Sequence, residues 1–379
     1  MIDLIRTTRS NQKTFNLMQR RPFLATLGAT AAALTTGAKA QESDRKKLGW
    51  AVVGLGSLAT NQIAPALQKA KHSKLAAIVT GTPEKAEKWK QQYSLPDSHV
   101  YDYETFDKLA ENSDVDVIYI VLPNSMHEEF VIRGAKAGKH VFCEKPMATS
   151  ADECRRMISA MKEAGKQLGV GYRCQFEPHH RECMRLAQEK VFGDLKFIEA
   201  GFGFQIGDPK QWRLRKDLAG GGALMDVGIY ALQACRYLTG EEPLEIVAQE
   251  VKTDPVKFAE VDETISWSMK FPSGVMASVM TTYAFNGVNS FTAICQNGKF
   301  GMDPAYSYGD LKGWTSRPEV KIEFPGVDHF LTEMDAFSEA ILNEQAFQPS
   351  GEEGLRDLLA IEAIYRSISE KKSVSVEVA

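Results

Sequence analysis

The chain has 379 residues, of which 44% are hydrophobic and 25% are charged, and its formal net charge is −4. This length predicts two domains, and this composition excludes a mainly disordered chain or a coiled coil. The slight negative charge argues against a nucleic-acid partner, which requires a basic surface. No run of about eighteen apolar residues occurs, so we expect no transmembrane helix and no membrane partner for the mature chain.

Residues 1–40 differ from the rest of the chain and are predicted to form a targeting segment. They hold six basic residues and one acidic residue. Arg20-Arg21 precedes a mild apolar stretch rich in Ala, Thr and Gly, and Ala38-Lys39-Ala40 forms a small-x-small cleavage site. This layout is typical of a twin-arginine signal peptide, so we expect a protein exported in folded form to the periplasm. The alternatives are an accidental arginine pair on a disordered tail and a translation start at Met18.

Residues 41–170 alternate short apolar strands with helices. We predict strands at 48–53, 75–80, 115–122, 140–143 and 167–172, and helices at 59–70, 83–93, 128–137 and 151–164. Such alternation is typical of a parallel sheet with right-handed crossovers. The sequence therefore predicts an α/β domain of the Rossmann type.

Residues 171–379 have longer, alternating strands and fewer helices. We predict strands at 196–204, 244–252, 263–271, 275–283 and 290–296, and helices at 178–190, 223–238, 331–342 and 351–370. This pattern favours an α+β domain with an open, mostly antiparallel sheet. The six cysteines lack zinc or redox spacing, so we expect small buried residues and no metal site, with one disulfide left open.

The segment Gly54-Leu55-Gly56-Ser57-Leu58-Ala59 has the GxGxxA pattern of a dinucleotide site. It follows a predicted strand and opens a predicted helix, which is the context that this motif requires. Gly54 permits a tight turn, Gly56 lets the backbone approach a pyrophosphate, and Ala59 allows close packing of helix and strand. Because a helix N-terminus also favours anions, we predict a nucleotide site here rather than a plain turn.

The end of the second predicted strand distinguishes between cofactors. NAD-binding folds place Asp or Glu there to accept from the ribose hydroxyls. This chain has Val79-Thr80-Gly81-Thr82, followed by Lys85. Thr80 can hydrogen-bond a 2′-phosphate and Lys85 can supply positive charge, so we predict NADP. The alternative is that Lys85 is one more solvated surface lysine.

Glu144-Lys145-Pro146 follows another predicted strand, at the sheet edge where such folds bind ligands. A lysine beside a nicotinamide can hold a substrate hydroxyl and favour its deprotonation. Pro146 restricts Lys145 to an extended conformation. Glu144 could pair with Lys145 or with the ribose.

Gly220-Gly221-Gly222 precedes Asp226 and Tyr230, which are four residues apart and share one face of a predicted helix. A tyrosine hydroxyl beside a lysine ammonium should have a lowered pKa, because the cation favours the phenolate. Tyr230 would then be a base for the oxidation of an alcohol. An Asp–Tyr pair on a helix is also commonly structural.

Together these motifs resemble the family of glucose–fructose oxidoreductase, inositol dehydrogenase and MocA, over almost all of the chain after residue 40. Most members carry histidine where this chain has Tyr230, which resembles the glucose–fructose oxidoreductase branch. Further stretches similar to that branch are 122–130, 137–150, 171–178, 211–222 and 240–243.

The resemblance implies an NADP-dependent sugar oxidoreductase in which Tyr230 is the acid–base, Lys145 tunes and orients it, and Asp226 positions the sugar. It also implies a homodimer or homotetramer, because the open sheet face assembles subunits in this family. The other residues that it places near the cofactor or substrate are Tyr103, Leu122, Pro123, Asn124, His127, Arg173, Trp212, Arg213 and Tyr283.

Three functions remain open from the sequence. The first is hydride transfer from C1 of an aldose to NADP, giving a lactone, with possible reduction of a second sugar. The second is an aldose dehydrogenase or reductase that releases its cofactor, because only 41–47 stands in place of the arm that retains the cofactor in glucose–fructose oxidoreductase. The third is a sensor of sugars or nucleotides without catalysis.

Overall fold

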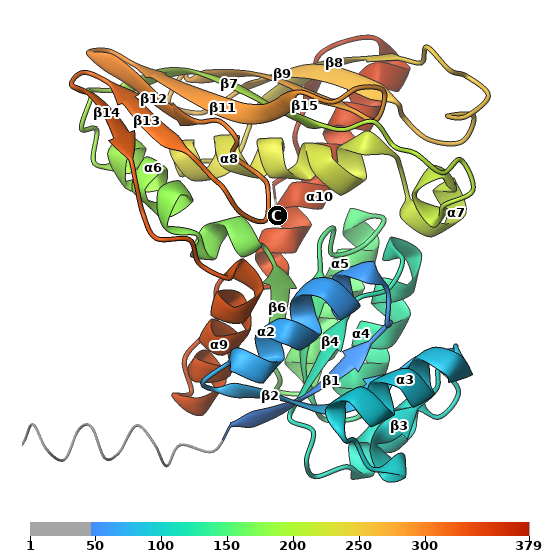
Figure 1. Ribbon diagram of the computed structural model, residues 1–379. Helices are drawn as coiled ribbons and strands as arrows, with labels where there is room; N and C mark the ends of the chain where they lie inside the picture. Colours follow the sequence, from blue (N-terminus) through green and yellow to red (C-terminus); the bar gives the residue numbers. More distant parts are fainter. Residues whose placement is uncertain (1–46, 379) are drawn as a thin grey trace, which may run out of the picture. The chain divides into compact units, whose positions relative to one another are not determined.

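A computed structural model describes residues 47–378, whose strands form two sheets (Figure 1). The predicted signal peptide and the alternative start at Met18 lie outside the described residues. The strands that were predicted to alternate with helices in the first part of the chain form one sheet. The longer strands that follow form the other.

The first sheet has six strands in the order β3-β2-β1-β4-β5-β6, and all of its pairs are parallel. This is the predicted Rossmann-type arrangement. The strand order reverses between β1 and β4, which is where an open α/β sheet has its ligand crevice. The strands are β1 (Leu48–Val53), β2 (Ser73–Val79), β3 (Val100–Tyr101), β4 (Val117–Ile120), β5 (His140–Glu144) and β6 (Leu168–Gly171).

Helices cover both faces of this sheet. Trp50 and Val52 of β1 belong to one apolar cluster, which also contains Phe337, whereas Ala51 and Val53 belong to another with Phe130. Alternate residues of a strand point to opposite faces, so each cluster marks one face. The helices that follow the strands are α2 (Ala64–Lys69), α3 (Pro83–Tyr93), α4 (His127–Lys136) and α5 (Ala151–Glu163), with short 3-10 turns at Asp97–His99, Phe106–Glu111 and Asn124–Met126.

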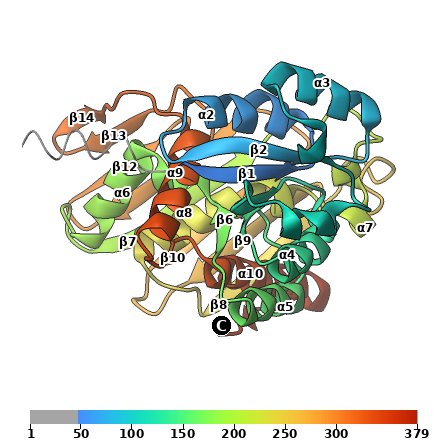
Figure 2. The ribbon, with the colours of Figure 1, turned by 90° about the horizontal axis from the view of Figure 1, so that it is seen from below.

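A late helix also packs on the first sheet. Helix α9 (His329–Leu342) contacts β2 and α2, as Figure 2 shows from below. The Trp50 indole Nε1 donates to Ser338 Oγ at 3.0 Å, and the Asp335 carboxylate accepts from the backbone N–H groups of Lys71 and His72. A helix from late in the chain therefore completes the core of the first sheet.

The second sheet has nine strands in the order β14-β13-β12-β11-β7-β10-β9-β8-β15. Only the β7–β10 pair is parallel among the described pairs, which confirms the mostly antiparallel prediction. The strands are β7 (Leu195–Gly203), β8 (Glu245–Val251), β9 (Thr264–Lys270), β10 (Met276–Thr282), β11 (Val288–Cys295), β12 (Gly298–Met302), β13 (Gly313–Ser316), β14 (Glu319–Ile322) and β15 (Val374–Ser375).

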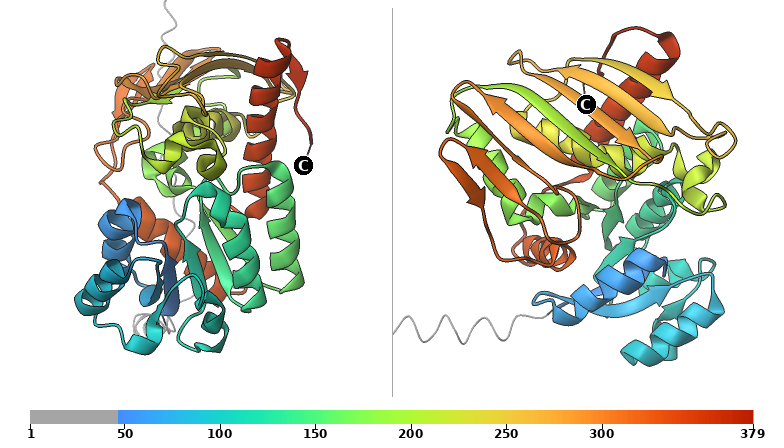
Figure 3. Two further views of the ribbon diagram at one scale, coloured as in Figure 1. Left: turned by 90° about the vertical axis from the view of Figure 1, so that its right-hand side faces the viewer. Right: turned by 45° about the horizontal axis from the view of Figure 1, so that its top comes forward.

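One face of the second sheet is covered by helices, and in the described part of the chain the other face carries none (Figure 3). Helix α8 packs on β7, β10 and β11, and α10 contacts β8, β6 and α5, so α10 joins the two sheets. The helices of this part are α6 (Pro178–Gln188), α7 (Lys216–Ala219), α8 (Ile229–Thr239) and α10 (Gly351–Glu370), with 3-10 turns at Arg173–Phe176 and Trp212–Leu214.

Two predicted helices begin with a π-helical turn. The predicted helix 59–70 is a π turn over Ala59–Ile63 followed by α2, and 223–238 is a π turn over Leu224–Gly228 followed by α8. Pro65 lies in the first turn of α2 and has no N–H to donate, which interrupts the regular ladder. By length and composition alone, Lys216–Thr239 could cross a membrane, but 83% of its most apolar window is buried, so we interpret it as a core helix.

All six cysteines are buried and none forms a disulfide. Within residues 47–378, no group of three or more His, Cys, Asp and Glu side chains is arranged to hold a metal ion.

Candidate active site

Loops of the first sheet meet loops of the second part of the chain at one groove of about 330 Å³. The first sheet contributes residues at or after the carboxyl ends of all six of its strands. The second part contributes the turn after β7 and the start of α8. The residues that line the groove and that the sequence singled out are Gly54, Gly56, Ser57, Leu58, Thr80, Lys85, Tyr103, Leu122, Pro123, Glu144, Lys145, Arg173, Trp212, Arg213, Asp226 and Tyr230.

The glycine loop after β1 has the shape that a dinucleotide requires. Gly54 has φ of +94°, and a Cβ added to it would lie 2.4 Å from the Val121 carbonyl oxygen, so only glycine fits. A Cβ added to Gly56 would meet nothing within 4 Å, so the backbone there is open to the groove. A pyrophosphate would occupy that open space against the backbone. Ala59 is buried beneath the loop and does not line the groove.

The end of β2 forms a second, polar part of the groove. Thr80 is almost fully buried, and its Oγ1 accepts from the Thr82 N–H at 3.2 Å. The Tyr103 ring lies directly against Gly81. Thr80, Thr82, Lys85 and Tyr103 line this end, and none of the four is acidic. Their chemistry suits a phosphate better than a bare ribose diol.

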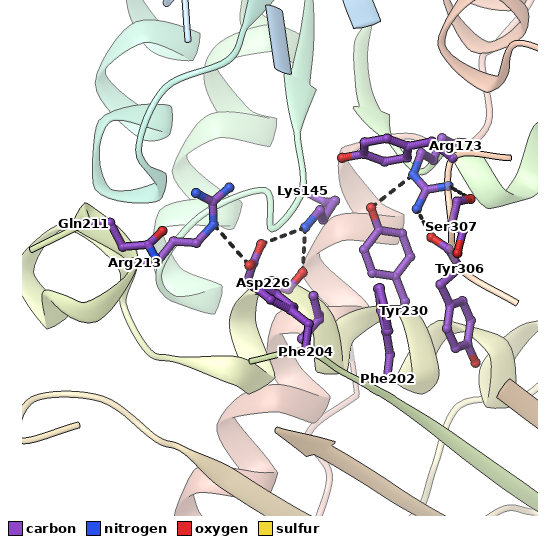
Figure 4. Close-up of a pocket in the computed structure, with 12 residues that line it drawn as sticks. Lys145, Arg173, Phe202, Phe204, Gln211, Arg213, Asp226, Tyr230, Tyr306 and Ser307 are labelled. Atoms are coloured by element: carbon purple, nitrogen blue, oxygen red, sulfur yellow. Dashed lines mark hydrogen bonds and ion pairs between the residues drawn. The ribbon is translucent and has the colours of Figure 1, made fainter. Parts of the chain in front are cut away.

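Lys145, which follows β5 of the first sheet, and Asp226, in the π turn before α8, meet in an ion pair (Figure 4). The Lys145 ammonium donates to the Asp226 carbonyl oxygen at 2.6 Å and to Oδ1 at 3.3 Å. Arg213 Nε and the Tyr283 hydroxyl donate to Asp226 Oδ2, at 3.1 and 2.8 Å. Burial opposes the charge of Asp226, but Lys145, Arg213 and Tyr283 outweigh burial and lower its pKa. The carboxylate is therefore ionised at neutral pH.

Tyr230 lies beside this pair at the start of α8. The Lys145 ammonium is 4.8 Å from the centre of the Tyr230 ring, above its face. The cation that contacts the hydroxyl is Arg173, whose Nε donates to the Tyr230 oxygen at 3.2 Å. Burial raises the pKa of Tyr230, against the lowering effect of Arg173. The prediction of a pKa lowered by lysine is therefore wrong, because desolvation dominates and the lysine charge faces the ring and Asp226.

A second cavity of about 410 Å³ adjoins the groove and shares several of its residues, including Lys145, Asp226 and Tyr230. Aromatic rings form much of its wall, and amide, hydroxyl and charged groups point into it. This mixture suits a small polyol, which has apolar C–H faces and many hydroxyls. The lining residues that the sequence did not indicate are Phe202, Phe204, Gln211, Val227, Tyr306, Ser307 and Tyr308, with Thr82, Val121 and Phe330 in the groove.

Besides Ala59, three predicted cofactor residues lie behind the groove instead of lining it. Asn124 Nδ2 donates to the Ala219 carbonyl at 2.8 Å, which joins the loop after β4 to the α7 turn. The two ring nitrogens of His127 lie 2.9 and 3.0 Å from the carbonyl oxygens of Leu122 and Pro146. Tyr283 acts through Asp226, as described above. These residues hydrogen-bond to the loops that form the groove.

Glu144 lines the groove from beneath Lys145. It does not form an ion pair with Lys145 in the described structure: the Tyr119 hydroxyl donates to its Oε1 at 2.7 Å, and its Oε2 lies 3.3 Å from the Lys145 backbone N–H. Burial raises its pKa. Glu144 therefore contributes hydrogen bonds to the loop that carries Lys145.

Comparison with known proteins adds to this geometry. The model of the oxidoreductase family with an NAD-binding Rossmann fold, GFO_IDH_MocA, matches residues 48–172, and that of the GFO/IDH/MocA C-terminal domain matches residues 180–301. The crystal structure of aldose–aldose oxidoreductase from Caulobacter crescentus, complexed with glycerol, is similar with a TM-score of 0.85 and 43% identity, covering 87% of this chain and all of that one.

Two further proteins are similar over much of their length. D-xylose 1-dehydrogenase [NADP(+)] from Haloarcula marismortui is 29% identical over 336 residues, which is 86% of this chain and 93% of that protein. Trans-1,2-dihydrobenzene-1,2-diol dehydrogenase from Xenopus laevis is 28% identical over 278 residues, which is 73% of this chain and 81% of that protein.

Proposed function

This chain belongs to the GFO/IDH/MocA family of oxidoreductases, and from this premise we propose that it is an NADP-dependent sugar oxidoreductase that oxidises an aldose at C1. The observation that carries the proposal is the meeting of Lys145, Asp226 and Tyr230 where the groove joins the polyol-sized cavity. A hydride donor in the cavity would lie next to a nicotinamide in the groove.

The groove residues fit a dinucleotide. The open backbone at Gly56 would receive the pyrophosphate, and Thr80, Thr82 and Lys85 would receive the 2′-phosphate of NADP. The similarity to an NADP-dependent xylose dehydrogenase supports the same choice. When bound, the nicotinamide accepts or returns a hydride at the sugar carbon.

The three side chains then divide the work of the oxidation. Tyr230 takes the proton of the C1 hydroxyl while the C1 hydrogen leaves as hydride, so C1 becomes a carbonyl and the ring becomes a lactone. Two of the three Lys145 N–H groups bind Asp226, and the third would donate to the sugar oxygen. Asp226 fixes the lysine, and its carboxylate would accept from a neighbouring sugar hydroxyl.

The same site supports a second half-reaction in which Tyr230 returns the proton and a second aldose is reduced to an alditol. The 43% identity to an aldose–aldose oxidoreductase favours this cycle. The similarity to D-xylose 1-dehydrogenase favours the second candidate, an aldose dehydrogenase that releases its cofactor.

Spectroscopy of the purified full chain separates these functions. The proposed cycle predicts that one aldose produces the absorbance of reduced nicotinamide without added cofactor, and that a second sugar removes it. Turnover that requires added NADP would instead establish the dehydrogenase. Absence of any change with a panel of aldoses and NADP would contradict both and favour a sensor.

We also propose that the protein acts in the periplasm after export by the twin-arginine route. This rests on Arg20-Arg21, the apolar stretch that follows and Ala38-Lys39-Ala40. Replacement of both arginines by lysine should abolish export and leave the activity in the cytoplasm, as measured by cell fractionation. Unchanged export of the Lys–Lys variant would contradict the route.

The helix-free face of the second sheet supports a homodimer or homotetramer. Val247, Val251 and Met276 are exposed on its strands. Apolar side chains exposed on one sheet face are typical of an interface between subunits. Light scattering of the purified protein at several concentrations tests this, and a monomer at every concentration would contradict it.

A further inference from the structure

Arg173 is a buried cation without an acidic partner. Its side chain is 2% exposed, and within the described chain no carboxylate lies in ion-pair contact with it. Its guanidinium instead donates to neutral groups: the Ser307 carbonyl at 3.2 Å, the Tyr306 carbonyl and the His329 Nδ1 at 3.1 Å. A buried charge that is hydrogen-bonded to neutral groups exerts a strong field on nearby groups, and Glu144 and Glu333 are among the groups that it affects.

A fourth donor of Arg173, Nε, bonds the Tyr230 oxygen at 3.2 Å. Because that oxygen accepts from Arg173, its own hydrogen must point in another direction, and Tyr230 lines the cavity. Figure 4 shows the guanidinium on the side of the phenol away from Asp226. The bond therefore orients the hydroxyl and places positive charge where the phenolate would form.

Lys145 does not compete for this role. Its ammonium binds the Asp226 carbonyl and carboxylate, at 2.6 and 3.3 Å, and lies above the Tyr230 ring instead of at its oxygen. The negative charge of Asp226 offsets that of the ammonium. A charged hydrogen bond to the oxygen favours the phenolate more than a neutralised cation above the ring.

We propose that Arg173 is the positioning residue that orients the Tyr230 hydroxyl and stabilises its phenolate, while Lys145 and Asp226 hold the sugar. This inference rests on the proposed function, and it assigns the two cations of the site different tasks. Arg173 also ties the Tyr306–Ser307 segment of the cavity wall to the proton-transfer group.

Several titratable groups surround Tyr230 and affect a pH experiment. Burial lowers the pKa of His329 to about 4, with the Arg173 charge adding to the effect, so this ring is neutral and accepts from Arg173 at neutral pH. Cys174 has a lowered pKa, because His180 and Arg173 outweigh its burial. A Cys174→Ser background therefore removes a thiol that titrates near Arg173. The other neighbours from packed elements are Glu144, Lys145, Asp226, Tyr306 and Tyr308 around Tyr230, and the buried Glu333 of α9 near Arg173.

The first experiment measures kcat for aldose oxidation as a function of pH in three proteins, all of which carry Cys174→Ser. Arg173→Met and Arg173→Lys are compared with the protein in which Arg173 is unchanged. We expect Arg173→Met to lose tenfold or more at neutral pH and to raise the apparent pKa of the base by about one pH unit or more. Part of its activity should return at high pH. Arg173→Lys keeps the charge and should show a smaller rise.

A double-mutant cycle distinguishes action through Tyr230 from general damage. Arg173→Met added to Tyr230→Phe should cost less than threefold, because the hydroxyl that Arg173 serves is already absent. The proposal would be overturned if the double variant lost kcat by the product of the two single losses. It would also be overturned if Arg173→Met lowered kcat equally at every pH and left the pH profile unchanged.

A second readout does not need turnover. 3,5-Difluorotyrosine incorporated at position 230 reports its ionisation by ¹⁹F NMR, and its midpoint should rise by about one pH unit or more when Arg173 is replaced. Equal midpoints would refute the role of Arg173 even if sugar oxidation is observed. If no aldose is oxidised, the proposed function fails while this titration still tests Arg173. Should Arg173→Met not fold, as judged by circular dichroism, Arg173→Gln provides the same comparison, because its amide can still donate to a carbonyl.

Discussion

The groove, where we place the cofactor, and the adjoining cavity, where we place the sugar, are assembled in different ways. The glycine loop, Thr80 and Lys145 each follow a strand of one parallel sheet, so the shared carboxyl edge of that sheet brings them together. The cavity wall combines the end of β7, the turn after it, the start of α8 and the segment after β12. Local motifs build the first site, whereas the second depends on long-range packing. The two sites should therefore respond differently to substitution.

The largest effect should come from Tyr230, which is one of the residues that line both the groove and the cavity. We expect Tyr230→Phe to lower kcat for aldose oxidation about 100-fold or more, because positioned acid–base groups typically contribute this much. Tyr93→Phe, which removes a hydroxyl from α3 outside both sites, is the matched control. A Tyr230→Phe enzyme with the rate of the unmodified chain would exclude Tyr230 from proton transfer.

The next effect should be confined to the cofactor groove. Thr80→Asp places a carboxylate where we locate the 2′-phosphate, so the Kd for NADPH should rise roughly tenfold or more while that for NADH changes little. Fluorescence titration with both nucleotides measures this, and Thr80→Ser, which keeps the hydroxyl, is the control. Equal weakening of both nucleotides would show that the 2′-phosphate binds elsewhere.

A smaller effect, from substitution of Asp262, should distinguish binding in the cavity from binding in the groove. The Asp262 carboxylate accepts from the backbone N–H groups of Gly222 and Leu224 at 2.6 and 2.8 Å, and from the Tyr365 hydroxyl at 2.7 Å. Asp262→Asn should cost about 1–3 kcal/mol of unfolding free energy, because a buried N–H group loses its partner. Sugar KM should rise more than the Kd for NADPH.

Asp254→Asn, at an exposed turn, is the control for this stability measurement by thermal denaturation. If Asp262→Asn raises the Kd for NADPH as much as the KM for the sugar, the groove and the cavity do not respond independently to substitution.

The smallest effect concerns the segment between the two sheets, where the Glu177 carboxylate lies 2.6 Å from His179 Nδ1 and 3.0 Å from His180 Nδ1. Burial opposes the charge of His180, but Cys174 and Glu177 outweigh it and raise its pKa to about 9. Burial likewise opposes the charge of Glu177, but the two histidines outweigh it and lower its pKa to about 2.

The two shifts act on stability in opposite pH ranges. A histidine whose pKa is raised by folding stabilises the folded state at pH values below its unfolded pKa near 6.5. This contribution to stability is lost as the pH rises toward 9. The lowered pKa of Glu177 stabilises the folded state above about pH 4.5, and that contribution is lost as the pH falls toward 2. His180→Asn should therefore reduce the fall of Tm between pH 6.5 and 9 by about 2 °C or more. An unchanged pH dependence would contradict the ion pair.

The sequence predicted the groove better than the cavity, for a physical reason. A GxGxxA turn and the residue after a strand carry their geometry locally, so Gly54, Gly56, Thr80 and Lys145 line the groove where expected. The residues Tyr306 and Ser307 have no such pattern, because they reach the site through the pairing of β11 and β12 and the bonds to Arg173.

The wrong prediction about Tyr230 has the same origin. Spacing along a helix shows which side chains can be neighbours, but it does not show where the ammonium of Lys145 points or how deeply the phenol is buried. Helix bounds such as Pro83–Tyr93 and Gly351–Glu370 agree with prediction because proline, glycine and apolar periodicity determine them locally. The sequence reading omitted β3, β12, β13, β14, β15 and α7, which are short elements stabilised by pairing or by neighbouring loops.

The return of α9 to the first sheet constrains how this protein can be synthesised and divided. Trp50 lies in one buried cluster with Phe330, Met334 and Phe337 of that helix. While the ribosome is still producing residues before His329, one side of the earliest strands lacks its cover and must be shielded by chaperones or by loose collapse. A gene truncated after the nucleotide motif would therefore yield an aggregation-prone fragment, and domain-exchange engineering should carry α9 together with residues 47–172.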